Sequence, residues 1–102
     1  MSFELDVWRE AQDDIADAVS WYGDKSPGLG SQFLDTVEEC LTHVSAQPAR
    51  FPVVHGDTRR ALLRRFPYGV FFFIDDTHLR VVAVMHARRD PARWQSRVSA
   101  DR

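Results

Sequence analysis

The spacing of apolar residues changes along the chain and predicts the elements. Residues 3–7 (FELDV) alternate apolar and acidic positions, which predicts a short strand with one buried face. Residues 8–24 repeat apolar positions at helical spacing and predict an amphipathic helix, with Asp6 or its neighbour as the cap. After the turn GDKSPGLGS, helical spacing resumes as far as Pro48. The first half is therefore predicted to be a helical hairpin.

The second half has the composition of strands. Residues 47–58 (QPARFPVVHGDT) hold two prolines and a glycine and predict a connecting loop. The strand-like runs are RRALLRR, YGVFFFI and HLRVVAVM, and the DDT between the last two predicts a hairpin. These last two runs are apolar on both alternating faces, which predicts central strands covered by helices. In DPARWQSRV, Asp90 as cap and Pro91 at the first position predict a short terminal helix.

Length and composition bound the class of protein. A chain of 102 residues with 44% apolar residues can bury one core, so residues 1–102 are expected to form a single domain. Cys40 is the only cysteine, which excludes a disulfide framework. It lies at helical spacing among apolar residues and is expected to be buried. The N-terminus lacks signal-peptide features, and no apolar run approaches the roughly 20 residues of a membrane span. A cytoplasmic protein without membrane contact is the expectation.

The charges are divided unevenly between the two halves. Residues 1–58 carry three cations and eleven acids, whereas residues 59–102 carry ten arginines and four acids. This polarity suggests that the second half meets an anionic partner, either nucleic acid or an acidic protein segment. The alternative is that these charges only form solvated faces and ion pairs. Composition alone leaves both interpretations open.

Two segments in this order of elements carry a resemblance to a known family. RRFPYGVFF (64–72) and VMHARRDPARW (84–94), within the order β-α-α-β-β-β-α, resemble the ParE/RelE superfamily of toxins from type II toxin–antitoxin (plasmid stabilisation) systems. The resemblance spans residues 3–97. It implies an α+β fold with an antiparallel-dominated sheet covered by the N-terminal helical hairpin. It also implies a cytoplasmic toxin that a cognate antitoxin neutralises.

The superfamily holds two target classes, and the sequence has candidate residues for each. RelE-like members cleave messenger RNA in the ribosome, and here His86 would act as base or acid while Arg88 and Arg65 hold the phosphate. The alternative for His86 is that its ring closes the strand by hydrogen bonding to a neighbouring backbone group or carboxylate. Arg88 and Arg89 would then pair with acids such as Asp90.

ParE-like members inhibit DNA gyrase, and the low overall basicity favours this class over a ribosome-bound nuclease. In that case the chain acts by protein binding and is not an enzyme. The antitoxin is expected to lay an acidic helix or strand on an arginine-rich surface around residues 59–65 and 88–97. The predicted partner-binding residues are Arg59, Arg60, Arg64, Arg65, Tyr68, Arg88, Arg89, Arg93 and Arg97.

Other features are expected to be structural. Trp94 is predicted to pack the terminal helix onto the sheet, and Phe66 and the three phenylalanines at 71–73 are predicted core residues. His43 and His55 lack a third ligand at regular spacing, so neither a metal nor a cofactor is expected. Homodimers of the chain and hetero-oligomers with the antitoxin both stay open.

Overall fold

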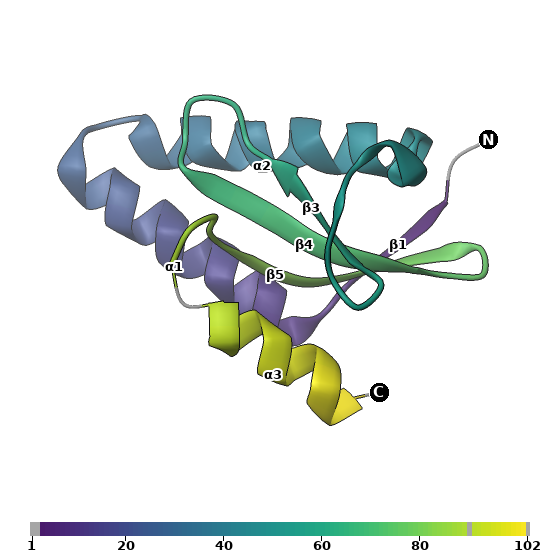
Figure 1. Cartoon of the computed structure of the whole chain (residues 1–102). Coiled ribbons are helices and arrows are strands. Elements are labelled where there is room, and N and C mark those ends of the chain that lie inside the picture. Colours follow the sequence, from purple (N-terminus) through teal and green to yellow (C-terminus); the bar gives the residue numbers. More distant parts are fainter. Residues whose placement is uncertain (1–2, 90, 102) are drawn as a thin grey trace.

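The computed structural model describes residues 3–89 and 91–101 and shows an α+β fold (Figure 1). Its elements are β1 (Glu4–Val7), α1 (Arg9–Lys25), α2 (Leu29–Ala46), a 3-10 turn (Pro48–Arg50), β2 (Val53–His55), β3 (Thr58–Leu62), β4 (Tyr68–Asp75), β5 (His78–His86) and α3 (Pro91–Asp101). The strands form one sheet in the order β1-β5-β4-β3-β2. Among the described strands, β1 alone pairs in parallel, with β5, and the other pairs are antiparallel. The predicted fold class and the order of the main elements are confirmed.

Strands β4 and β5 form the centre of the sheet, and both of their faces are covered. The hairpin of α1 and α2 packs on one face, where the buried residues include Phe33, Val37, Val70, Phe72, Leu79 and Val81. On the other face α3 covers Phe71, Phe73, Val82, Ala83 and Met85. Figure 1 shows α2 above the strands and α3 below them in that view. The apolar character of both strand faces is explained by this three-layer arrangement.

Trp94 and Cys40 occupy the places predicted for them. Trp94 is 5% exposed, and its ring stacks on Phe71 with 4.5 Å between the ring centroids, so it holds α3 against the sheet. Cys40 is buried in the hairpin core, and burial raises the pKa of its thiol to about 11. None of the helices in the described part of the chain combines the length and apolar character needed to span a membrane.

The segment predicted as a loop at 47–58 is more ordered than expected. It holds the 3-10 turn and the edge strand β2, in which Val53 pairs with Arg59 and the Arg60 N–H donates to Pro52 O at 3.0 Å. Strand β2 has only three residues and all are exposed, so burial leaves no periodic signal there. The neighbouring strand β3 ends at Leu62, so the predicted strand was too long at its end.

The predicted cap of α1 was wrong. Trp8 stands at that position and makes no side-chain hydrogen bond to the helix end. Asp6 instead pairs with Arg80, whose Nη1 lies 2.7 Å from a carboxylate oxygen, so its charge ties β1 to β5. At the other end of the chain Pro91 begins α3 as predicted. The capping role assigned to Asp90 falls outside the described residues.

The pairing of β5 with β4 is interrupted by one extra residue, and its pairing with β1 is short. Phe71 pairs with Ala83 and Phe72 pairs with Val81, so Val82 is an extra residue and forms a β-bulge. On its other side β5 pairs with β1 only from His78 to Val81. The C-terminal half of β5 therefore runs beyond the end of its parallel neighbour.

Gly30 allows α1 and α2 to approach closely at the hairpin turn. A Cβ at Gly30 would lie 2.6 Å from Val19 O, a backbone atom that cannot yield as a flexible side chain does. We expect Gly30→Ala to lower the free energy of unfolding by about 1–3 kcal/mol in urea denaturation. Gly23→Ala is the matched control, because a Cβ there meets nothing within 4 Å, and it should raise stability by up to about 1 kcal/mol. Equal effects of the two substitutions would contradict this packing.

Candidate functional site

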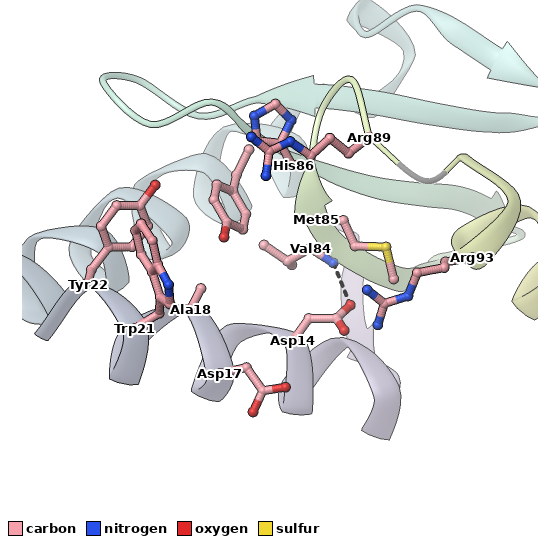
Figure 2. Close-up of a pocket in the computed structure, with 11 residues that line it drawn as sticks. Asp14, Asp17, Ala18, Trp21, Tyr22, Val84, Met85, His86, Arg89 and Arg93 are labelled. Carbon is pink, nitrogen blue, oxygen red and sulfur yellow. Dashed lines mark hydrogen bonds between the residues drawn. The ribbon is translucent and has the colours of Figure 1, made fainter. Parts of the chain in front are cut away.

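A pocket of about 380 Å³ opens between α1, the end of β5 and the turn that leads to α3 (Figure 2). Helix α1 contributes acidic and aromatic side chains, and the opposite wall carries a histidine and two arginines. The lining residues are Asp14, Asp17, Ala18, Trp21, Tyr22, Tyr68, Val84, Met85, His86, Arg89 and Arg93. Figure 2 shows His86 and Arg89 across the pocket from the residues of α1.

Asp14, which lines this pocket, joins three elements by hydrogen bonds. Its carboxylate accepts two hydrogen bonds from the Arg97 guanidinium, at 2.7 and 3.0 Å, and a third from the Val84 N–H at 3.0 Å. Arg97 also donates to Val82 O at 2.9 Å. The hydrogen bonds to Asp14 raise the pKa of Arg97 although burial opposes them. The pair joins α1, β5 and α3, with only 16% of Arg97 and 9% of Asp14 side-chain surface exposed.

Tyr68 and His86 stand side by side on paired strands at one end of the pocket. They are cross-strand partners, and their ring centroids are 6.1 Å apart. Partial burial raises the pKa of Tyr68, while the charge of Arg89 acts to lower it. Burial also raises the pKa of Tyr22, which lines the same pocket. Both phenols therefore remain protonated near neutral pH and can donate as well as accept hydrogen bonds.

The ring of His86 is engaged with the backbone of the turn that follows it. The Arg88 N–H donates to His86 Nδ1 at 3.3 Å, and the Arg89 N–H donates to the His86 carbonyl at 3.3 Å. An accepting Nδ1 places the proton of the neutral ring on Nε2. The ring of His86 thus bonds to a neighbouring backbone group at the end of β5, as expected if this residue has a structural role.

The structure brings together only part of the predicted catalytic set. His86 lines the pocket, whereas Arg88 and Arg65 do not. Arg88 is exposed in the turn after β5, and Arg65 is exposed in the connection between β3 and β4. Among the described residues no group of three histidine, cysteine or acidic side chains could hold a metal ion.

The predicted partner-binding arginines divide into two groups. Arg59, Arg60 and Arg97 are partly buried and donate to main-chain carbonyls, those of Phe51, Ala87 and Val82. The exposed group is Arg64, Arg65, Arg88, Arg89 and Arg93, of which the last two line the pocket with Tyr68. Arg64 also forms an ion pair with Glu39 at 2.9 Å.

Sequence reasoning missed the side of the pocket that α1 forms. The helical spacing of residues 8–24 predicts an amphipathic helix, but it does not indicate that Asp14, Asp17 and Tyr22 line a pocket. The available signal was Trp21, a large aromatic residue outside the apolar stripe of the helix, which is 54% exposed. It packs edge to face on Tyr22 with 4.9 Å between the centroids, and the Lys25 ammonium lies 4.7 Å from its ring centroid.

Arg65 adopts a left-handed backbone conformation with φ 68°, which is unfavourable for a residue with a Cβ. Glycine adopts this region without steric cost, and β-branched residues are the least tolerant. We expect Arg65→Val to have a free energy of unfolding about 1–2 kcal/mol lower than that of Arg65→Gly, measured in urea. Equal stability of the two variants would contradict a left-handed residue at this position.

The model of the family described as "ParE toxin of type II toxin-antitoxin system, parDE" matches residues 6–91. The chain belongs to the ParE toxin family. This ParE-family chain is also 27% identical to Toxin ParE2 of Mycobacterium tuberculosis over 103 aligned residues, which cover 97% of the chain and 95% of that relative.

Solved structures share the fold of this ParE-family chain. A structure of the chromosomal ParDE system of P. aeruginosa has a TM-score of 0.75 at 15% identity, covering 83% of this chain and 96% of the other. An arginine-to-alanine double mutant of E. coli RelE in the free state has a TM-score of 0.68 at 17% identity, covering 99% of this chain and 98% of the other. The RelBE2 toxin–antitoxin complex of Mycobacterium tuberculosis has a TM-score of 0.58 at 23% identity, covering 84% of this chain and 99% of the other. These likenesses confirm the ParE/RelE fold.

Proposed function

We propose that this ParE-family toxin arrests growth by binding DNA gyrase in the cytoplasm, and that a cognate antitoxin neutralises it. The observation that carries the proposal is the match of the ParE family model to residues 6–91, because ParE-like members of the superfamily inhibit gyrase. The chain then acts as a protein ligand and makes or breaks no bond.

The arrangement of the candidate catalytic residues supports binding over catalysis. Metal-independent cleavage of RNA needs a base, an acid and cations around one phosphate. Arg65 and Arg88 do not line the pocket that holds His86, and His86 Nδ1 already accepts the Arg88 N–H. A RelE-like endoribonuclease is the second candidate, because Tyr68, His86, Arg89 and Arg93 do line one pocket.

An antitoxin partner fits the surface charge of the second half. Arg64, Arg65, Arg88, Arg89 and Arg93 are all exposed and can meet an acidic protein segment. Two of the solved relatives come from paired systems, ParDE and RelBE2, and the latter is a toxin–antitoxin complex. We expect the antitoxin complex to be a hetero-oligomer, and its mass in solution gives its stoichiometry.

Purified components test the gyrase proposal. DNA gyrase is assayed for ATP-dependent supercoiling of relaxed plasmid while the purified chain is added, alone and after mixing with its antitoxin. The expected result is loss of supercoiling with the chain alone and recovery with the antitoxin. Full supercoiling at a large molar excess of a folded chain that arrests growth would contradict the proposal.

His86→Ala separates the two candidate functions. If the chain acts by binding gyrase, we expect the variant to arrest growth at the same induction level as the wild-type chain. An essential general acid or base contributes about 10²–10⁴-fold to rate, so a nuclease would lose its toxicity. The variant must also retain its circular dichroism spectrum and thermal midpoint. A folded but harmless variant would favour the ribonuclease.

A further inference from the structure

We propose that one exposed face of α1, an acidic stripe anchored by Trp21, is the surface by which the chain binds DNA gyrase, and that it docks on a cationic surface of that enzyme. The inference rests on the proposed function, because it names the part of the chain that meets the target and the charge that the target must present. Three features of the described residues support it: the alignment of the stripe, the acids that the fold leaves unpaired, and an aromatic side chain that is open to solvent.

Four acids and one tryptophan lie in line along α1. Each is three or four positions from the next, and residues at this spacing are neighbours on one face of a helix. All five are exposed, whereas Ala11 and Ala18, on another face, are buried. These neighbours form the acidic stripe, which consists of Glu10, Asp13, Asp17, Trp21 and Asp24.

The acidic stripe is unfavourable for the helix that carries it. Like charges three or four positions apart repel one another and destabilise a helix. Asp24 also lies in the last turn of α1, where the partial negative charge of the helix end disfavours a carboxylate. The stability of α1 therefore does not account for this arrangement of acids.

The two acids in the C-terminal half of the stripe have no electrostatic role in the fold. Within residues 3–89 and 91–101 neither Asp17 nor Asp24 forms an ion pair. Figure 2 shows the Asp17 carboxylate directed away from the opposite wall of the pocket. The two acids at the other end differ, because their charges, after the hydrogen bond to Asp14, help to raise the pKa of Arg97. Asp17 and Asp24 are thus available to meet the charges of another molecule.

Trp21 supplies an apolar anchor within the stripe. It is 54% exposed and is the one aromatic residue among the exposed large apolar side chains of the described residues. Tyr22 packs edge to face against its ring, and the Lys25 ammonium lies over that ring. A side chain held in this way loses little conformational freedom on binding. Tryptophan is also among the residues that most often dominate the binding energy of protein interfaces.

The charge of the stripe selects between the two proteins that are proposed to bind this chain. Surfaces of opposite charge associate, and surfaces of like charge repel. The antitoxin is expected to bring an acidic segment to the arginines of the second half, and the stripe would repel such a segment. Gyrase binds DNA, and the phosphates of DNA require cationic protein surfaces. Gyrase is therefore the partner that fits the acidic stripe.

Trp21→Ala tests the anchor. Purified gyrase is immobilised, the affinity of the chain is measured by surface plasmon resonance, and inhibition of supercoiling is the second readout. The variant should bind gyrase about 30-fold or more weakly, while its affinity for the antitoxin changes less than about threefold. Leu34→Ala is the matched control, because Leu34 is a half-exposed apolar residue of α2 outside the stripe. It should change the affinity for gyrase less than about threefold, and both variants must keep their circular dichroism spectra.

Neutralising two acids tests the charge of the stripe. Asp17→Asn with Asp24→Asn should weaken gyrase binding about tenfold at low salt, and the difference from wild type should shrink as salt rises. These changes remove like charges from α1, so the fold is retained. Asp35→Asn with Glu38→Gln makes the same change in net charge at two exposed acids of α2 and should change the affinity less than about threefold. Equal effects of the two double variants would overturn the assignment.

Other outcomes distinguish failure of the inference from failure of the proposed function. If the wild-type chain neither binds nor inhibits gyrase, both fail together. If the wild-type chain inhibits gyrase and folded Trp21→Ala inhibits it equally, only the inference is overturned. A variant that loses the antitoxin and keeps gyrase would assign the stripe to the antitoxin. A variant that dissociates a dimer of the free chain and keeps gyrase would assign the stripe to a second copy, and either result overturns the inference.

Discussion

Replacing Asp14 with alanine is expected to lower the free energy of unfolding by about 3–5 kcal/mol, the cost of leaving a buried charge without its partner. Arg97 would keep its charge in a site where only 16% of its side chain is exposed, with Val82 O as its remaining acceptor. The Val84 N–H would lose its acceptor as well. Urea denaturation followed by circular dichroism measures this loss.

Asp13→Ala is the matched control for Asp14→Ala. Asp13 is the neighbouring acid on α1 and is exposed, so its removal should change the free energy of unfolding by no more than about 0.5 kcal/mol. A second check replaces both partners, because Asp14→Ala with Arg97→Met removes the unpaired charge and should be more stable than Asp14→Ala alone. A loss for Asp14→Ala as small as that for Asp13→Ala would contradict the three-element anchor.

Reversing the charge of Arg64 and Arg65 together is expected to weaken the antitoxin complex by about 10–100-fold at low salt. Both side chains are exposed at the connection between β3 and β4, where they can meet an acidic segment. Arg64→Glu would also face Glu39, whose carboxylate lies 2.9 Å from the Arg64 guanidinium. Isothermal titration calorimetry with the purified antitoxin measures the change in affinity.

The salt dependence and a charge-conserving variant complete this test. The difference between wild type and the charge-reversed variant should shrink as salt rises, since exposed charges are screened. Arg64→Lys with Arg65→Lys keeps both charges and should retain most of the affinity. The remaining loss reflects the two-pronged hydrogen bonds to carboxylates that arginine makes and lysine cannot. Unchanged affinity of the charge-reversed variant at both low and high salt would refute an electrostatic role for this surface.

The sequence predicted the elements whose burial is periodic. The two long helices and the central strands β4 and β5 each bury a regular set of apolar residues, so their spacing carried the signal. Strand β2 was missed because its three residues are exposed and are held by backbone pairing with β3. The parallel pairing of β1 with β5 joins residues more than seventy positions apart, which spacing within one segment cannot reveal.

The candidate site was only partly predictable for a related reason. Arginine content marked the second half as basic, but which arginines are exposed depends on contacts far away in sequence. Arg97 was predicted to bind a partner, yet it is held by Asp14, which lies 83 positions earlier. The pocket lined by Val84 and His86 depends on where β1 ends and on the bulge at Val82, and neither has a signature in the residues themselves.

Pulse-labelling of DNA and protein synthesis in bacteria, just after induction of the chain without its antitoxin, tests the central claim most directly. Gyrase inhibition predicts that incorporation of labelled thymidine falls first, while incorporation of labelled methionine persists, and that co-induction of the antitoxin restores both. If methionine incorporation collapses first while DNA synthesis continues, the chain acts on translation and the gyrase proposal is contradicted.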